Sequence, residues 1–222
     1  MTTKTLNISE EQLVDYSKAH NEPSWMTELR KKALKLTETL EMPKPDKTKL
    51  RKWDFDTFKQ HHTTGDSYHQ LTDLPKSVKE IIDVENSENL IIQHNNDLAY
   101  TQVSDQAKND GVIIEGLSEA LVNHSDLVQK YFMTKAVNVD EHRLTALHTA
   151  LVNGGIFVYV PKNTVVEHPI QYVVLHDDEQ ASFYNHVIIV TEESAEVTYV
   201  ENYLSTTSGE DNQLNIVSEV IA

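Results

Sequence analysis

The chain has 222 residues, enough for one large domain or two small ones with a sizeable hydrophobic core. Its formal net charge is −16, which argues against general nucleic-acid binding. It has no cysteine, and this excludes disulfides, thiolate nucleophiles and cysteine-ligated zinc or iron–sulfur clusters within these residues.

The N-terminal region lacks the apolar segment of a signal peptide, and no apolar run in the chain is long enough to span a bilayer. We therefore expect a cytoplasmic protein without a membrane partner.

The N-terminal region predicts two helices. Ser9 is a good N-cap, and Gln12 completes a capping box. A second helix is predicted to begin at Pro23 and Ser24. Apolar residues at helical spacing give this helix one stripe, formed by Trp25, Leu29, Ala33, Leu36 and Leu40.

Charge is unevenly distributed along the sequence. Residues 28–52 are rich in Lys and Arg and include Arg30, which lies off the apolar stripe. A solvated face usually accounts for such a cluster, and the alternative is a docking surface for an acidic partner. Residues 43–80 are polar and predict loops and short helix. Beyond Lys162 there is no Lys or Arg, so the last part of the chain is acidic.

From residue 89 the pattern changes to short strands. Residues 89–104 predict a β-hairpin around an Asn-Asn-Asp turn, and residues 111–117 predict a third strand. Residues 118–132 then predict a helix with apolar residues roughly on one face.

A further helix is predicted over residues 140–153, with Asp140 as its N-cap and Gly154 or Gly155 as its left-handed stop. His148 lies on the apolar face of this helix, where a hydrogen-bonded core histidine is commoner than a metal ligand. A phosphate-binding loop requires strand, glycines and then helix. The order here is the reverse, so the glycines do not predict a nucleotide site.

The remainder of the chain predicts one strand after another, separated by turn residues: 156–160, 170–175, 183–190, 196–203 and 214–221. No gap between these strands is long enough for a helix, so the pattern fits a sandwich, a barrel or a β-solenoid. The sequence ends at Ala222 within a strand pattern. We therefore expect the fold to continue past this point or to be covered there by a partner.

Three histidines of the strand region, His168, His176 and His186, come from successive corners or strands and are candidate ligands of a cupin-like metal site. The closely spaced His-x-His pair of such sites is missing. Glu167 and His168 would point to opposite faces of a strand, so they do not form an acid–base pair. The sequence thus assigns no catalytic, cofactor-binding or metal-binding residue, and a cupin-like metal-binding β protein stays the alternative function.

One stretch resembles a known family. Residues 143–171, RLTALHTALVNGGIFVYVPKNTVVEHPIQ, are similar to the signature of the SufB/SufD family of iron–sulfur cluster assembly proteins. Residues 23–34, PSWMTELRKKAL, resemble the start of its SufD branch. In SufB-like chains the stretch matching residues 196–203 tends to end in cysteine. Here that position is Tyr203, so the resemblance is closest to SufD.

The resemblance implies an α+β chain: an N-terminal helical domain over residues 1–88, a mixed strand–helix region over 89–153, and over 154–222 the start of a right-handed parallel β-helix, a solenoid that continues beyond this sequence. It implies a non-catalytic scaffold subunit that binds no cofactor itself, while an iron–sulfur cluster is assembled transiently on the complex. The implied partners are a SufB-like subunit and a SufC-like ATPase, with a homodimer as a further option.

Overall fold

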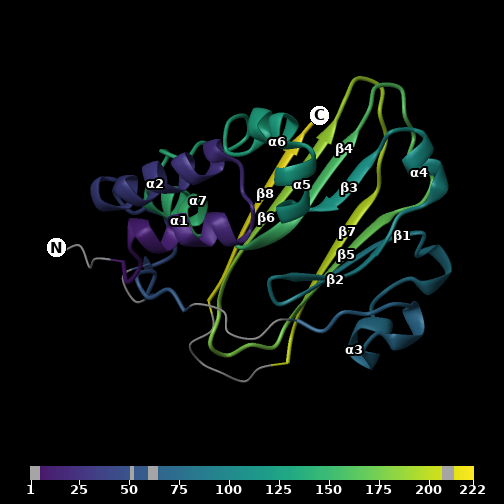
Figure 1. The fold of residues 1–222 in the computed structure, drawn as a ribbon, viewed down its shortest axis with the longest axis horizontal. Coiled ribbons are helices and arrows are strands. Elements are labelled where there is room, and N and C mark those ends of the chain that lie inside the picture. The colour runs from purple at the N-terminus through teal and green to yellow at the C-terminus, as the bar shows by residue number, and fades with distance from the viewer. Residues whose placement is uncertain (1–5, 51–52, 60–64, 207–212) are drawn as a thin grey trace.

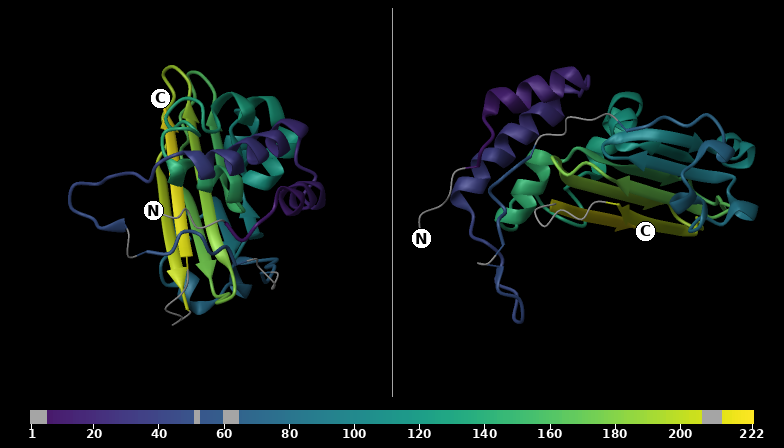
Figure 2. Two further views of the ribbon diagram at one scale, coloured as in Figure 1. Left: turned by 90° about the vertical axis from the view of Figure 1, so that its left-hand side faces the viewer. Right: turned by 90° about the horizontal axis from the view of Figure 1, so that it is seen from below.

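The computed structural model describes residues 6–50, 53–59, 65–206 and 213–222. It contains two four-stranded sheets and a layer of helices (Figures 1 and 2). The α-helices are α1 (Glu10–Ala19), α2 (Ser24–Thr39), α3 (Lys76–Lys79), α4 (Asp105–Asn109), α5 (Leu117–Asn123), α6 (Ser125–Tyr131) and α7 (Arg143–Leu151). The strands are β1 (Asn89–His94), β2 (Asp97–Gln102), β3 (Ile113–Gly116), β4 (Gly154–Val160), β5 (Ile170–His176), β6 (Ser182–Thr191), β7 (Tyr199–Ser205) and β8 (Gln213–Ile221).

The two sheets are mixed. Their strand orders are β2-β1-β5-β7 and β3-β4-β6-β8. Strands β4 to β8 alternate between the sheets and run parallel to one another within each sheet, whereas β2 and β3 each pair antiparallel at one edge. The expectation of a right-handed parallel β-helix is therefore wrong, and only the α+β class is kept.

The pattern of the last strands could not decide between these architectures, because short strands with regular corners suit a solenoid and a pair of stacked sheets alike. The backbone pairing of β1, β2 and β3 decides it, since these strands complete both sheets with antiparallel edges. The boundaries at residues 88 and 153 stay a prediction.

The main core lies between the two sheets. Inward-facing residues of both sheets fill it, and they include Ile91, Ile156, Val158, Tyr172, Phe183 and Val187. A second core lies between the sheet β3-β4-β6-β8 and the helices α2, α5 and α6, around Met26, Leu117, Phe132, Phe157 and Ile188. The short helix α3 covers the outer face of the other sheet, where Val78 contacts the cluster that contains Leu90 and Val173. None of the described helices is long and apolar enough to cross a membrane.

The N-terminal helices confirm the capping prediction and correct the stripe. Ser9 and Gln12 form the predicted capping box of α1, and α2 begins at Ser24. Its buried residues are Met26, Arg30, Ala33 and Thr37, so only Ala33 of the predicted stripe is fully buried. The prediction failed because it allowed only apolar residues to face inward, whereas Arg30 is buried with a partner.

Helix ends in the middle of the chain also differ from the prediction. The helix expected over residues 118–132 is interrupted at His124, which separates α5 from α6. The N-cap of α7 is His142 rather than Asp140, because the His142 ring accepts the backbone N–H of Thr145. Helix α7 ends at Leu151, ahead of the glycines, which instead begin β4.

The strands themselves were well predicted. The hairpin over residues 89–104 is confirmed as β1 and β2, and residues 111–117 contain β3. The later strands are confirmed, although β7 begins at Tyr199 rather than at residue 196. In the polar stretch 43–80, a 3-10 turn at Leu71–Asp73 and helix α3 are present, while residues 51–52 and 60–64 lie outside the described residues.

Candidate functional site

The three candidate metal ligands lie in different places. His176 is on β5 in one sheet, and His186 is on β6 in the other. His168 precedes β5, and its Nδ1 lies 3.5 Å from Glu88 Oε2. Within the described ranges, no group of three or more His, Asp and Glu side chains could hold a metal ion. The cupin-like alternative therefore has no site in that part of the chain.

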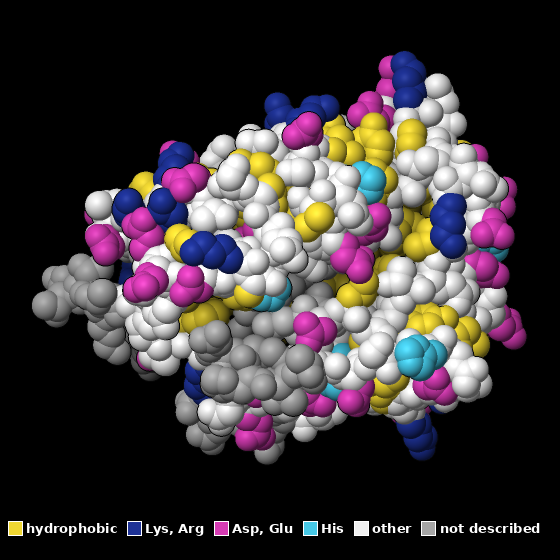
Figure 3. Space-filling view, viewed as in Figure 1, with side chains coloured by type: hydrophobic (Ala, Val, Ile, Leu, Met, Phe, Trp, Pro, Cys, Tyr) yellow, Lys and Arg dark blue, Asp and Glu magenta, His cyan; other side chains and the backbone are white. Residues whose placement is uncertain are grey.

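Where the Lys- and Arg-rich residues 28–52 form part of helix α2, acidic neighbours largely balance their positive charge. Lys31 and Lys35 both approach the carboxylate of Glu10 from α1, at 3.5 and 3.3 Å, and Lys31 also binds Glu28. Figure 3 shows Lys and Arg side chains over these helices interspersed with Asp and Glu. This face of α2 is thus a solvated face of mixed charge rather than a positive docking surface.

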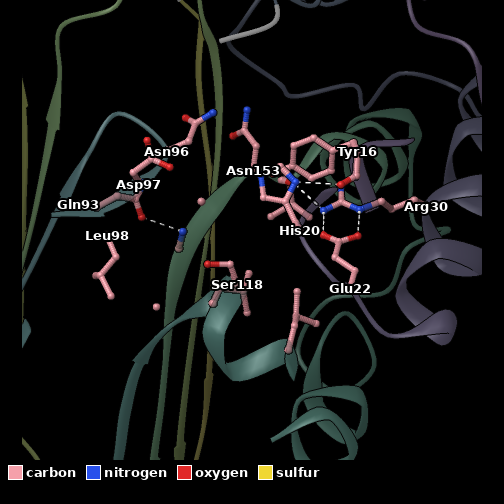
Figure 4. A pocket seen from close by; sticks show the side chains of 16 residues that line it. Tyr16, His20, Glu22, Arg30, Gln93, Asn96, Asp97, Leu98, Ser118 and Asn153 are labelled. Carbon is pink, nitrogen blue, oxygen red and sulfur yellow. Dashed lines mark hydrogen bonds and ion pairs between the residues drawn. The ribbon is translucent and has the colours of Figure 1, made fainter. Parts of the chain in front are cut away.

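A polar recess lies between the N-terminal helices and the start of β4 (Figure 4). Its narrow part has a volume of about 90 Å³ and adjoins a wider recess of about 740 Å³ beside α1. Its lining mixes polar and charged side chains with the apolar Leu98, Leu117, Leu121 and Val152. The polar and charged ones are Tyr16, His20, Glu22, Arg30, Gln93, Asn96, Asp97, Ser118 and Asn153.

Arg30 forms one wall of this recess and is fully engaged by the protein. Its guanidinium binds both carboxylate oxygens of Glu22 and the carbonyl oxygens of Ala150 and Val152. It also lies 5.0 Å from the centre of the Tyr16 ring. Because these bonds join α2 to the junction of α7 with β4, Arg30 holds the helical layer onto the sheet instead of offering a free cation to a ligand.

The charge on Glu22 is maintained despite its burial. Burial alone would raise the pKa of Glu22, but the Arg30 charge and hydrogen bonds from Arg30 and Ser17 outweigh it and hold the pKa below its ordinary value. The pair is therefore ionised at neutral pH.

Glycines at the start of β4 allow an unusually close approach of three strands. Gly155 has φ +143°, and a Cβ atom there would lie 2.0 Å from the carbonyl oxygen of His186. A Cβ at Gly154 would lie 2.4 Å from Gln93 Nε2. Gln93 of β1 accepts the backbone N–H of Gly155 at 3.0 Å and the hydroxyl of Tyr172 at 2.6 Å. These glycines thus serve the close packing of β4 against β6 in its own sheet and against Gln93 of the other sheet, and not helix termination.

A second polar cluster lies under the helices. The histidine network is a linear hydrogen-bonded series that joins β8, α7 and β6. Its four members, in order, are Asn215, His148, His186 and Glu219. The His148 Nδ1 lies 2.7 Å from Asn215 Oδ1, and His148 Nε2 lies 2.9 Å from His186 Nδ1. The series ends where His186 Nε2 meets Glu219 Oε1 at 3.0 Å. The prediction that His148 is a hydrogen-bonded core histidine is confirmed.

Glu219 is fully buried, and hydrogen bonds compensate its carboxylate. Besides His186, the backbone N–H of Met133 reaches Oε1 at 2.7 Å and that of Val137 reaches Oε2 at 3.1 Å. The carboxylate therefore fixes the segment after α6 onto strand β8. Both histidines are also fully buried.

Strands β7 and β8 are neighbouring edges of the two sheets. Each is paired on one side only among the described strands, with β5 and β6 respectively. On β8, residues alternate between the helical side, where Val217 and Ile221 pack, and the opposite side, where Leu214, Ile216 and Val220 are exposed. Neither strand contains Lys, Arg or Pro, residues that commonly protect an edge from pairing.

The sequence pattern missed Arg30, because it is charged and was placed off the apolar stripe, and it made no assignment for Glu219. For each residue, the spacing from its apolar neighbours nevertheless indicated an inward-facing position. Arg30 lies four residues after Met26 and three before Ala33, on a helical face. Glu219 alternates with Val217 and Ile221 on one side of a strand.

Comparison with known proteins gives consistent matches. A family model described as "SufBD protein N-terminal region" matches residues 9–172. The iron–sulfur cluster assembly protein SufD of Bacillus subtilis (strain 168) is 48% identical over 217 residues, covering 97% of this chain and 50% of the relative. An iron–sulfur cluster assembly SufBD family protein of Pyrococcus horikoshii is 29% identical, covering 88% of this chain and 45% of the relative. One from Staphylococcus epidermidis is 26% identical, covering 96% and 48%. The chain thus spans about half the length of these curated relatives.

Proposed function

Because the chain belongs to the SufBD family, we propose that it acts in iron–sulfur cluster assembly as a SufD-like scaffold subunit and not as an enzyme. The observation that carries this proposal is the 48% identity to the protein named SufD, which extends over 97% of the chain. The iron–sulfur cluster is cargo in this role, assembled transiently on the complex and not held by this chain.

The residues agree with a scaffold role. The chain has no cysteine, so it supplies no thiolate to a nascent cluster from within these residues. In the two buried polar clusters, around Arg30 and His148, the hydrogen bonds join secondary-structure elements to one another. Such groups position a framework instead of presenting a nucleophile or general base to a substrate.

The proposed partners are a SufB-like subunit and a SufC-like ATPase, in the cytoplasm, with no nucleic acid and no membrane; a homodimer is a further option. The net charge of −16 supports the exclusion of nucleic acid.

Co-purification tests the proposal. The full-length protein that contains this chain would be co-expressed with tagged SufB-like and SufC-like chains under reducing conditions, and the complex would be isolated by size exclusion. We expect one assembly that contains all three chains, with B. subtilis SufD as the positive control. Elution of this protein alone, while the control assembles, would exclude the proposed role.

A further inference from the structure

The polar recess beside α1 is bounded by two separate parts of the chain. Tyr16 belongs to α1, and His20 is the C-cap of that helix. Asn96 lies in the turn between β1 and β2, and Asp97 begins β2. Figure 4 shows these two pairs on opposite sides of the recess. All four residues line both its narrow part and its wider part, so a ligand at this junction would contact the helical layer and the hairpin together.

The side chain of Asn96 offers an unused hydrogen-bond acceptor to the recess. Its Oδ1 atom is buried and has no hydrogen-bond partner. Buried polar atoms nearly always have a partner, so an oxygen of this kind in the wall of a cavity indicates a donor that the cavity takes up. A single water could satisfy the oxygen. The charges around it therefore have to identify the ligand.

Asp97 gives the junction an excess of negative charge. Its Oδ2 atom accepts the backbone N–H of Gly65 at 3.0 Å, and it forms no ion pair with a Lys, Arg or His of the described residues. The positive charge in the lining is that of Arg30, which the carboxylate of Glu22 neutralises. Two carboxylates against one guanidinium leave one negative charge in excess, which attracts a cation.

The α1 side of the junction adds an acceptor and no charge. His20 Nδ1 lies 2.8 Å from the carbonyl oxygen of Tyr16 and must donate to it, so Nε2 of the neutral ring is left as an acceptor. Burial raises the pKa of Tyr16 to about 12; Glu22 and Asp97 act in the same direction, and Arg30 acts in the opposite one. The Tyr16 hydroxyl therefore stays protonated at neutral pH.

Apolar side chains line the space on either side of the junction. The narrow part, about 90 Å³, has room for little more than a small head group, whereas the wider part, about 740 Å³, has the size of a small-molecule site. Apolar residues of the two parts include Leu98, Leu117 and Leu121, and Ile8, Leu13 and Ala19, respectively. An apolar body with one charged end fits this combination.

We propose that the recess binds a small organic cation, an ammonium group carried on an aliphatic chain. The ammonium donates to Asn96 Oδ1 and to the carboxylate of Asp97, and the chain lies along the apolar walls. Binding bridges α1 and the β1–β2 hairpin, and it does not depend on the scaffold role.

Three probes of one chain length test the charge of the ligand: pentylamine, 1-pentanol and pentanoate. Each would be titrated by calorimetry at pH 8 into the full-length protein that contains this chain. We expect pentylammonium to bind at least about tenfold more tightly than pentanol, and pentanoate to bind most weakly. Hydrogen exchange followed by mass spectrometry would locate the site, since pentylamine should slow exchange in residues 93–98 and 16–20.

Two isosteric variants test the part played by Asp97. Asp97→Asn removes the charge and keeps an acceptor for the N–H of Gly65, so pentylammonium should bind about tenfold more weakly while pentanol binding is unchanged. Asp140→Asn is the matched control. Asp140 is exposed and does not line the recess, so its variant should bind all three probes like the natural protein.

Four results would overturn the cation site. Pentanol binding as tightly as pentylammonium would mean that only the apolar walls act, and tighter binding of pentanoate would mean that Arg30 dominates. No binding of pentylamine at millimolar concentration would leave Asn96 Oδ1 to a water. Unchanged binding of pentylammonium by a folded Asp97→Asn variant is the fourth. The first three are measured on the natural protein, so they apply even if that variant does not fold.

Discussion

The Arg30 guanidinium and the Glu22 carboxylate form a bidentate ion pair, with nitrogen–oxygen distances of 2.6 and 2.8 Å, in which both side chains are at most 5% exposed. Arg30 belongs to α2, and Glu22 lies just before Pro23, the N-cap of that helix. The pair therefore sets the position of α2 on the body of the protein through the two carbonyl groups that Arg30 also binds.

Removing one member of this pair should be costly. Glu22→Gln leaves the buried Arg30 charge without its counter-ion, and we expect the free energy of unfolding to fall by about 3 kcal/mol in urea denaturation. Glu28→Gln is the matched control, because Glu28 forms an exposed pair with Lys31 and should cost less than about 1 kcal/mol. Equal losses in the two variants would mean that burial of the pair does not matter.

The same pair should make stability depend on pH in the acid range. The folded pKa of Glu22 lies below its ordinary value of 4.5, so the unfolded chain binds more protons. Stability from this group is therefore present above pH 4.5 and is lost as pH falls through the folded pKa. Urea denaturation at pH 6 and at pH 4 should show a loss that is smaller in Glu22→Gln. A loss of the same size in both proteins would assign the effect to other carboxyl groups.

Gly155 should tolerate no side chain. Gly155→Ala combines a left-handed φ with a Cβ placed 2.0 Å from a backbone oxygen, so we expect a loss of at least about 2 kcal/mol of stability. Gly111→Ala provides the comparison. Gly111 also has a positive φ, +74°, but its Cβ would meet its nearest neighbour at 3.7 Å, so a loss of about 1 kcal/mol is expected. Thermal denaturation of both would check the difference, and a smaller loss at Gly155 would contradict the packing described.

The edge of β8 should promote self-association of the 222-residue chain. Val220 is 63% exposed on an edge strand without Lys, Arg or Pro. Sedimentation velocity over a concentration series should show association that Val220→Lys reduces. Val122→Lys, at an exposed valine of α5, should leave it unchanged. A monomer at every concentration, or the same association in both variants, would contradict this use of the edge.

Local signals account for what the sequence predicted well. The hairpin of β1 and β2 is encoded by a short turn, and the N-cap of α1 by four adjacent residues. His148 could be assigned to the core because its own helix is apolar around it. Each of these features is settled within one turn or one helix.

Features that depend on distant partners were not predictable. Strand β1 pairs with β5, and this pairing helps to form two sheets where a solenoid was expected. The partners of His148 come from β6 and β8, so the histidine network could not be read from the helix alone. Arg30 was assigned to solvent because the carbonyl groups that bury it lie on α7 and beyond.

The parallel pairing of β1 with β5 has a consequence for synthesis of the chain. Strand β1 lies between β2 and β5 in its sheet, yet β5 follows it only after β3, β4 and four helices. At a translation rate of roughly 5–20 residues per second, the hairpin of β1 and β2 leaves the ribosome several seconds before β5 exists. A two-stranded hairpin is only marginally stable by itself. The nascent protein therefore exposes one edge of an apolar strand during this interval. A ribosome-bound chaperone would shield that edge until β5 is synthesised.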